Sequence, residues 1–188
     1  MSEFLSEGYR SVLTETHMSY GMRWGGAGKS HAETVLEFAQ QLQAFDVLDY
    51  GCGRGTLREA IPLPVKEYDP GIPGKDKLPE PADLVVCTDV MEHVEPDKID
   101  NVLKHLRTLT RKGIFLVIAL TPAKLTLSDG RNAHISLHPA NWWVEKLSKA
   151  GFIITRKQLR KGLWVWATPS NKVKAKIHFM MHHARGFR

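Results

Sequence analysis

A short apolar strand followed by closely spaced glycines constrains this 188-residue chain more than any other feature. Residues 47–55 read Val-Leu-Asp-Tyr-Gly-Cys-Gly-Arg-Gly, so an acid, Asp49, precedes glycines at 51, 53 and 55. Glycine has no Cβ, and such a turn therefore lets a ligand lie against the main chain. The pattern differs from the dinucleotide fingerprint G-x-G-x-x-G, because an acid comes first and the third glycine comes one residue early. A carboxylate at the end of the strand favours a ligand that carries an ammonium group.

Two later segments also place acids at the ends of expected strands. Residues 65–69 predict a strand that ends at Asp69, whose carboxylate can accept both hydroxyls of a ribose. Residues 82–94 predict a buried strand and the loop that leaves it. In this order, the three segments resemble the class I S-adenosylmethionine (SAM)-dependent methyltransferases. The resemblance implies SAM as the cofactor and, with the reasoning above, predicts these cofactor-binding residues: Asp49, Gly51, Gly53, Asp69 and Asp89.

The rest of the chain predicts an α/β fold in a single domain over residues 1–168. The spacing of apolar residues, with the Gly and Pro residues that end elements, predicts helices over 32–42, 56–61, 96–110 and 139–150. Lys112-Gly113 is expected to end the third helix. Further strands are predicted over 114–120, 152–159 and 162–168. The last two strands are separated by a short turn and predict an antiparallel hairpin, with Trp164 and Trp166 on one face. Trp142 and Trp143 lie in the last helix, and at least one of them is expected to pack in the core.

The segment between Asp69 and Asp83 departs from the family pattern. It holds only thirteen residues, rich in proline and glycine, where members of the family usually place a helix and a strand. We therefore expect an abbreviated Rossmann-like sheet with helices on both faces, and either Asp76 or Glu80 could replace the acid that usually recognises adenine. In its compactness the chain resembles small methyltransferase-like proteins of bacteriophages.

Residues 1–28 precede the predicted sheet, and two interpretations of them stay open. Aromatic and basic residues of this segment either close over SAM as a lid or pack an N-terminal helix in the ordinary way; they are Tyr9, His17, Tyr20, Arg23 and Trp24. Residues 25–30, Gly-Gly-Ala-Gly-Lys-Ser, do not form a phosphate loop, because the motif requires glycine at position 23, where Arg23 stands.

The acceptor side is predicted from Asp89, Glu92, His93 and His134. Asp89, Glu92 and His93 are expected to lie in a helical turn, where residues three and four apart share a face. Carboxylates and imidazoles are ligands for Mg²⁺, Mn²⁺ or Zn²⁺. The arrangement resembles the metal site of methyltransferases that act on the 3′-terminal ribose of small RNAs, and that of metal-dependent O-methyltransferases of quinone biosynthesis. The resemblance implies a divalent ion that holds neighbouring hydroxyls of the acceptor.

A metal-free role is the alternative, in which Glu92, His93 and His134 act as acid and base or position the substrate. His138, which directly precedes the expected helix at 139, is interpreted as a helix cap or a surface group.

Positive charge is concentrated at the C-terminal end. Residues 151–188 contain nine Lys or Arg and no Asp or Glu, within a chain of formal net charge +6. The basic tail at 169–188 either binds nucleic acid or is a solvated terminus that binds nothing. The methyl acceptor is accordingly expected to be a nucleic acid or nucleotide. The alternatives are a small-molecule or sugar O-methyltransferase and a non-catalytic basic module that binds nucleic acid.

The compartment is expected to be the cytoplasm. The two cysteines, Cys52 and Cys87, fall in the glycine turn and in a predicted buried strand, and neither is expected to be paired. The N-terminus lacks the pattern of a signal peptide, and no apolar stretch approaches the ~20 residues that span a bilayer. No membrane partner is expected.

Overall fold

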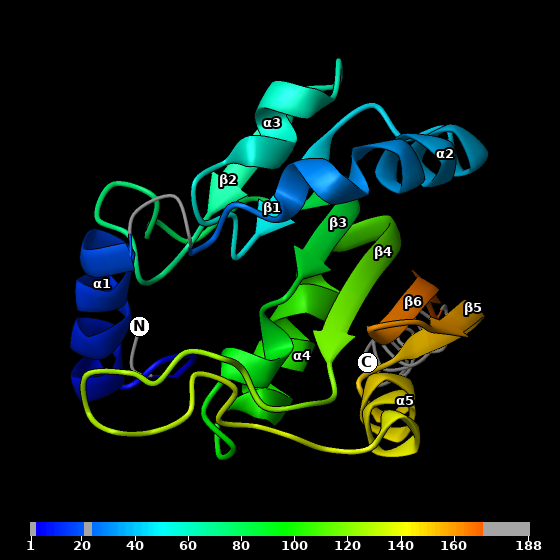
Figure 1. Cartoon of the computed structure of the whole chain (residues 1–188). Coiled ribbons are helices and arrows are strands. Elements are labelled where there is room, and N and C mark those ends of the chain that lie inside the picture. The colour runs from blue at the N-terminus through cyan, green and yellow to red at the C-terminus, as the bar shows by residue number, and fades with distance from the viewer. Residues whose placement is uncertain (1–2, 21–23, 171–188) are drawn as a thin grey trace, which may run out of the picture.

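A mixed sheet of six strands forms the centre of the molecule (Figure 1). The computed structural model describes residues 3–20 and 24–170. The strand order is β2-β1-β3-β4-β6-β5. The bounds are β1 Val47–Tyr50, β2 Val65–Tyr68, β3 Ala82–Thr88, β4 Thr110–Ala119, β5 Phe152–Leu159 and β6 Gly162–Pro169. The first four strands pair in parallel, whereas β6 pairs antiparallel with both β4 and β5. The abbreviated sheet and the C-terminal hairpin are thus confirmed.

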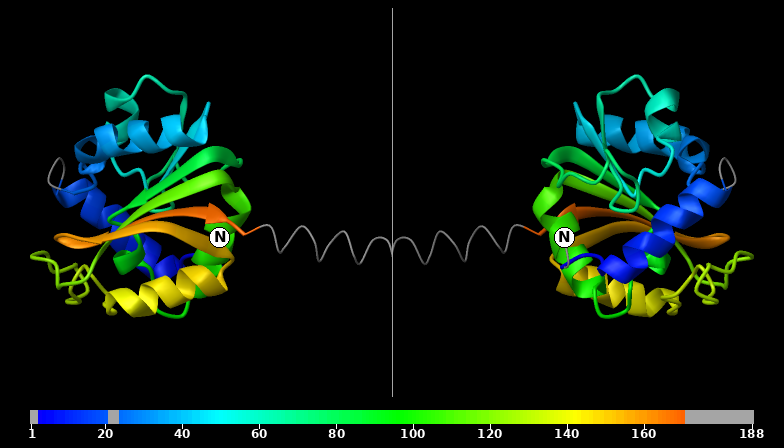
Figure 2. Two further views of the ribbon diagram at one scale, coloured as in Figure 1. Left: turned by 90° about the vertical axis from the view of Figure 1, so that its right-hand side faces the viewer. Right: turned by 90° about the vertical axis from the view of Figure 1, so that its left-hand side faces the viewer.

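Helices cover both faces of the sheet, as the turned views show (Figure 2). One face carries α2 (Ala32–Leu42) and α3 (Thr56–Ala60), and the other carries α4 (Ile99–Leu109) and α5 (Ala140–Lys149). The helix α1 (Glu7–Tyr20) packs elsewhere, against the loop after β2, where Thr14 Oγ1 donates to the carbonyl of Gly71 at 2.8 Å. The described residues also form two 3₁₀ turns, η2 (Gly28–His31) and η3 (Met91–His93).

Alternation along the buried strands divides the core into two layers. Leu48, Val85 and Leu116 face α4 and α5, whereas their neighbours Val47, Leu84 and Phe115 face α2 and α3. Consecutive strand residues point to opposite faces, so a strand covered on both sides is apolar throughout. The helix α4 buries the predicted stripe of Ile99, Val102, Leu103 and Leu106.

The two tryptophan pairs pack as their periods predict. In α5, Trp143 is fully buried, while Trp142 stacks on His138 with ring centroids 3.6 Å apart. In β6, Trp164 and Trp166 lie on one face and contact Phe115. Both cysteines are buried and free.

The boundary between α4 and β4 corrects one prediction. The helix starts at Ile99 rather than at Pro96 and ends at Leu109, and Lys112-Gly113, which was expected to end it, lies inside β4. Thr110 is already extended, with φ −90° and ψ 113°, so the helix passes directly into the strand. A Cβ at Gly113 would lie 2.4 Å from Leu42 Cδ1. Glycine at 113 therefore serves close packing of α2 on β4 rather than a helix stop.

Residues 69–81 contain no helix or strand, as expected from their length. Turns hold the segment together, with the amide of Asp69 bonded to the carbonyl of Lys75 at 2.9 Å. Asp76 forms an ion pair with Arg10 of α1. Most of the predicted basic tail, residues 171–188, lies outside the described residues, as does Arg23. Among the helices that the structure describes, none combines the length and apolar character required to cross a bilayer.

Candidate active site

A cavity of about 240 Å³ opens at the carboxyl ends of β1, β2 and β3. Its wall includes three groups of predicted residues: the turn at Asp49–Gly53, Asp69 after β2, and Asp89 with His93 after β3. The N-terminal segment closes the opposite side with His17 and Trp24. Crevices outside the carboxyl ends of parallel strands are the usual ligand sites of open α/β sheets. The residues that the sequence predicts for cofactor binding are therefore brought together around one hollow.

The glycine turn needs its glycines for conformation and for packing. Gly51 has φ 77°, and a Cβ there would lie 2.3 Å from Val90 Cγ2. Gly53 has φ 51°, and a Cβ there would lie 2.5 Å from the carbonyl oxygen of Gly25. Left-handed φ values favour glycine. Besides leaving room for a ligand, the glycines let the loops at 25 and 90 approach the turn.

Asp69 joins the end of β2 to the glycine turn. Its Oδ2 accepts a hydrogen bond from the amide of Gly53 at 3.0 Å, and its Oδ1 accepts one from the amide of Gly71 at 2.9 Å. His17 Nε2 lies 4.0 Å from Asp69 Oδ2, and burial lowers the pKa of this imidazole. The Asp69 carboxylate thus holds the glycine turn close to the end of β2, the two places at which one ligand is expected to bind.

Asp49 is buried at the base of the cavity. Burial, together with the nearby acids Glu67 and Asp69, raises its pKa to about 7, while Lys75 acts in the opposite direction. Lys75 Nζ donates to the carbonyl of Gly53 at 3.1 Å and lies 3.4 Å from Glu67 Oε1. The cavity floor is therefore a place where a ligand with positive charge would be stabilised.

The N-terminal residues divide between the two interpretations. His17 and Trp24 line the cavity, and the ring of Trp24 meets that of His93 edge-on at 4.8 Å. Tyr9 instead is buried in a separate cluster with Leu127 and Ala133. Tyr20 is 37% exposed on α1.

Gly25, Ala27 and Gly28 also line the cavity, which the sequence analysis missed. The carbonyl of Gly25 accepts from the amide of Arg54 at 2.9 Å, so the segment packs directly on the glycine turn. The cluster of glycines at 25–28 was the available signal: small residues permit this close approach.

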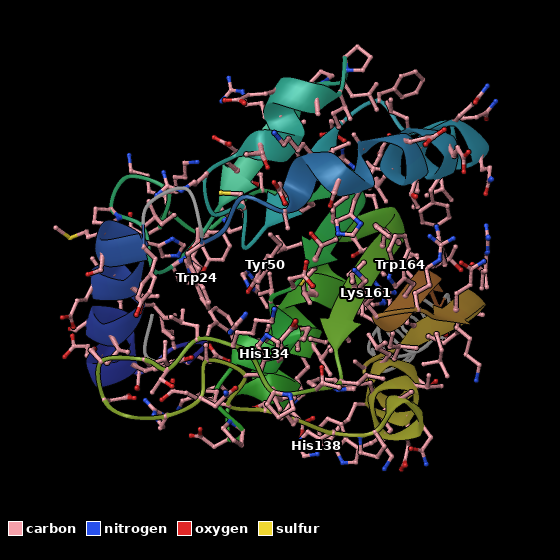
Figure 3. All side chains as sticks on the ribbon, in the orientation of Figure 1. Trp24, Tyr50, His134, His138, Lys161 and Trp164 are labelled. Atoms are coloured by element: carbon pink, nitrogen blue, oxygen red, sulfur yellow. The ribbon has the colours of Figure 1, made fainter. Side chains whose placement is uncertain are left out.

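Glu92, His93 and His134 converge, and the ring of His93 also contacts that of Trp24. Each offers one ligand atom, and these atoms lie within 4.8 Å of one another. Figure 3 shows His134 below Tyr50 and Trp24, on the loop that follows β4. His93 Nδ1 lies 2.7 Å from the carbonyl of Ala133, and His134 Nδ1 lies 2.6 Å from that of Thr121. A carbonyl only accepts, so both Nδ1 atoms donate, and the neutral form of each ring has its lone pair on Nε2.

Glu92 supplies a third unused acceptor. The side chain is fully buried, and its Oε1 accepts from the amide of Ala119 at 3.0 Å. Its Oε2 has no hydrogen-bond partner among the described residues. Burial raises the pKa of Glu92 to about 7 and lowers that of His93 to about 4. His93 is thus a neutral imidazole at physiological pH.

Asp89 does not join this group, which corrects the prediction that it would converge with Glu92 and His93. Its φ of 53° is left-handed, and the following turn is a 3₁₀ turn that begins only at Met91. The spacing rule for residues on one face of an α-helix therefore does not apply. The Asp89 carboxylate lies 3.8 Å from His31 Nε2 instead, and it lines the cavity.

Comparisons with known proteins agree with this geometry. Residues 24–164 match a family described as a methyltransferase domain. No curated protein matches the chain. Among solved structures, one similar to this chain is 1,6-didemethyltoxoflavin-N1-methyltransferase from Burkholderia thailandensis, with bound 1,6-didemethyltoxoflavin and S-adenosylhomocysteine (SAH). It is 18% identical over 87% of this chain and 89% of that chain, with a TM-score of 0.62.

Two further structures show the same fold. The DhpI–SAH complex is 20% identical over 90% of this chain and 99% of that chain, with a TM-score of 0.61. Magnesium protoporphyrin IX methyltransferase from Synechocystis PCC 6803, with bound SAH, is 18% identical over 79% of this chain and 85% of that chain, with a TM-score of 0.55. The family match covers most of the chain, and the strands, the glycine turn and the cavity agree with it. The chain therefore belongs to this methyltransferase-domain family, and its fold is that of the class I SAM-dependent methyltransferases.

Proposed function

We propose that the cavity binds SAM with its methionine end at Asp49, Gly51 and Gly53 and its ribose at Asp69. The 3.0 Å bond between the Gly53 amide and Asp69 Oδ2 keeps both regions within reach of one ligand. Two amides use one acceptor position on each oxygen of Asp69. A carboxylate has about four such positions, so about two are left for a ribose diol. SAM supplies an activated methyl, and the chain holds donor and acceptor in line and excludes water.

The charges around the cavity support a cationic ligand. Asp49, Asp69 and Asp89 all line it. A positive charge near Asp49 favours the ionised carboxylate, whose formation is disfavoured by burial while the site is free. Binding of SAM therefore offsets the electrostatic cost of burying the Asp49 carboxylate. Because the carboxylate loses its proton more readily in the complex, affinity for SAM rises with pH between about 5 and 8.

The acceptor hydroxyl is placed beside Glu92, His93 and His134. One observation carries this assignment: one ligand atom from each of the three side chains lies within 4.8 Å of the others, and Glu92 Oε2 has no hydrogen-bond partner among the described residues. A neutral imidazole in this position takes the proton of the acceptor as a general base. The same atoms also suit a divalent metal ion, because histidine ligands usually donate their second ring N–H to a carbonyl or carboxylate.

A divalent ion held by these residues would lower the pKa of a bound hydroxyl. Zn²⁺ and Mn²⁺ accept one carboxylate with two imidazoles, whereas Mg²⁺ prefers oxygen ligands throughout. The proposed metal ligands are accordingly Glu92, His93 and His134, without Asp89. The proposed acceptor is a hydroxyl of a nucleotide unit, which is supported by the excess of basic residues at 151–188.

Calorimetric titration with SAM and with SAH tests the donor site. Asp69→Asn should weaken SAM binding on the order of 100-fold, since hydrogen bonds to a charged group contribute about 1.5–3 kcal/mol each. Asp97→Asn is the matched control, because the Asp97 side chain is 72% exposed and does not line the cavity. The proposal is wrong if the wild-type protein binds neither SAM nor SAH.

The acceptor side is tested by His134→Ala against His138→Ala. His138 stacks on Trp142 and is not part of the converging group, so its loss should leave methyl transfer unchanged. His134→Ala should reduce methyl incorporation from labelled SAM about 100-fold or more while sparing SAM affinity. Elemental analysis and dialysis against EDTA separate the two roles: activity that survives metal-free conditions assigns the residues to acid–base catalysis.

A further inference from the structure

The face of the β5–β6 hairpin that carries the tryptophans also carries two arginines. Arg156 pairs directly across from Trp166, and its guanidinium carbon lies 4.5 Å from the centre of that ring. Arg160 lies over Trp164 at the same distance of 4.5 Å. We call these four residues the Arg–Trp face. Figure 3 shows Trp164 and Lys161 beside β4 and β6, on the other side of β3 and β4 from Trp24.

The tryptophan rings hold the two guanidinium groups in place. An arginine stacked on an indole keeps its N–H groups directed outward along its edge, and the side-chain order is established before a ligand binds. Both arginines are exposed. Neither forms an ion pair with any residue that the structure describes, and residues 152–170 contain no Asp or Glu. The Arg–Trp face is therefore a positive surface without a negative partner in the described part of the chain.

The placement of the arginines favours a particular kind of ligand. Arg156 lies in β5 and Arg160 in the turn that follows it, and the rings beneath them, Trp166 and Trp164, have centroids 6.2 Å apart. Each guanidinium group lies over its own ring. A ligand whose anionic groups repeat along its length, as in a nucleic acid, can bind both. The guanidinium fork binds a phosphate through two parallel hydrogen bonds.

Contacts connect the Arg–Trp face to the cavity that Asp89 lines, and His93 of the proposed acceptor site lines the same cavity. Trp164 pairs with Val117, whose carbonyl accepts from the amide of Asp89 at 2.9 Å. His31 lies between them, with its ring 5.1 Å from that of Trp164 and its Nε2 3.8 Å from the Asp89 carboxylate. A strand of nucleic acid that binds at Arg156 and Arg160 therefore runs toward the cavity that Asp89 lines.

We infer that the Arg–Trp face binds the phosphate backbone of a single-stranded nucleic acid and directs one nucleotide to the acceptor site. This inference rests on the proposed methyl transfer to a nucleotide. A single strand is favoured because a nucleotide that is paired and stacked inside a duplex does not reach a recessed catalytic site without being extruded. The sequence continues after β6 with five more Lys or Arg and no acid at 171–188.

Fluorescence anisotropy with labelled single-stranded RNA and DNA 12-mers tests the inference on the full chain. Arg156→Gln and Arg160→Gln should each weaken binding about tenfold, since a hydrogen bond to a charged group contributes on that order. Lys157→Gln is the matched control: it removes the same charge from the same hairpin, but Lys157 pairs with Val165 on the opposite face. This control should change affinity by less than about twofold. The double variant should reduce the slope of log affinity against log salt by about 1.4 for a single strand.

A second pair of variants tests the geometry rather than the charge. Arg156→Lys and Arg160→Lys keep the positive charge but lose the planar fork, and affinity should fall nearly as far as with Gln. SAM affinity, measured on every variant, reports intact folding and separates failure of this inference from failure of the donor site. Equal effects of Lys157→Gln and the arginine variants, no binding of single strands, or tighter binding of a polyglutamate peptide would each overturn it.

Discussion

Replacement of Asp49 by asparagine should stabilise the free protein and weaken SAM binding at the same time. Burial and the neighbouring acids raise the pKa of Asp49 from 3.8 to about 7, so the folded protein holds this proton more tightly than the unfolded chain does. Stability is therefore lost as pH rises from about 4 to about 7 and stays low above that range. Asparagine keeps the shape of the side chain without the charge, and it removes this loss.

The expected change in the free energy of unfolding follows from the pKa values of Asp49 in the unfolded and folded states. Each tenfold change in proton affinity contributes about 1.4 kcal/mol, so a pKa near 7 in place of 3.8 destabilises the folded wild-type protein by ~4 kcal/mol at pH 8. At pH 5 part of this loss has already occurred, which leaves a change of about 2–3 kcal/mol between pH 5 and pH 8. Any cost of burying the amide is the same at both pH values and cancels in this difference.

Urea unfolding of the wild type and Asp49→Asn at pH 5, 6, 7 and 8 measures the difference directly. The advantage of the variant should grow steadily across this range, while Asp97→Asn, which changes a side chain that is 72% exposed, should follow the wild type. Calorimetry should show that Asp49→Asn binds SAM more weakly and with no rise in affinity between pH 5 and 8. A constant difference in unfolding free energy between Asp49→Asn and the wild type would refute the reasoning.

Three other substitutions and conditions give further checks. Gly51→Ala should weaken SAM binding more than 10-fold and lower stability, because the new Cβ would lie 2.3 Å from Val90 Cγ2 in a backbone with φ 77°; near-normal calorimetric binding would contradict this. Trp143→Ala should cost about 3–5 kcal/mol in urea unfolding, whereas Trp142→Ala, which changes a half-buried ring, should cost clearly less. Titration of SAM at pH 7 in buffers of different ionisation enthalpy should reveal proton release on binding, and identical heats in phosphate and Tris would count against a raised pKa of Asp49 in the free protein.

Much of the fold was predictable because its signals are local. The apolar run at 114–120 predicts a buried central strand, and the period of α4 predicts which residues it buries. The acid–glycine pattern at 49–55 and the acids at strand ends predict a ligand site, because the ends of parallel strands meet at one edge of the sheet. The error at Lys112-Gly113 has the same origin: a glycine after a helix is typical of a stop, and only the packing of Leu42 shows another reason for it.

What the sequence alone determined is the α/β sheet, the glycine turn and the set of acids and histidines placed near its end. The tertiary structure decided which of these meet: Asp89 turns toward His31 because of its left-handed backbone, whereas Glu92 meets His93 and His134. It also placed Gly25 against Gly53 and the arginines over Trp164 and Trp166. These contacts join residues far apart in sequence through loops, whose paths depend on packing and on hydrogen bonds that no local period encodes.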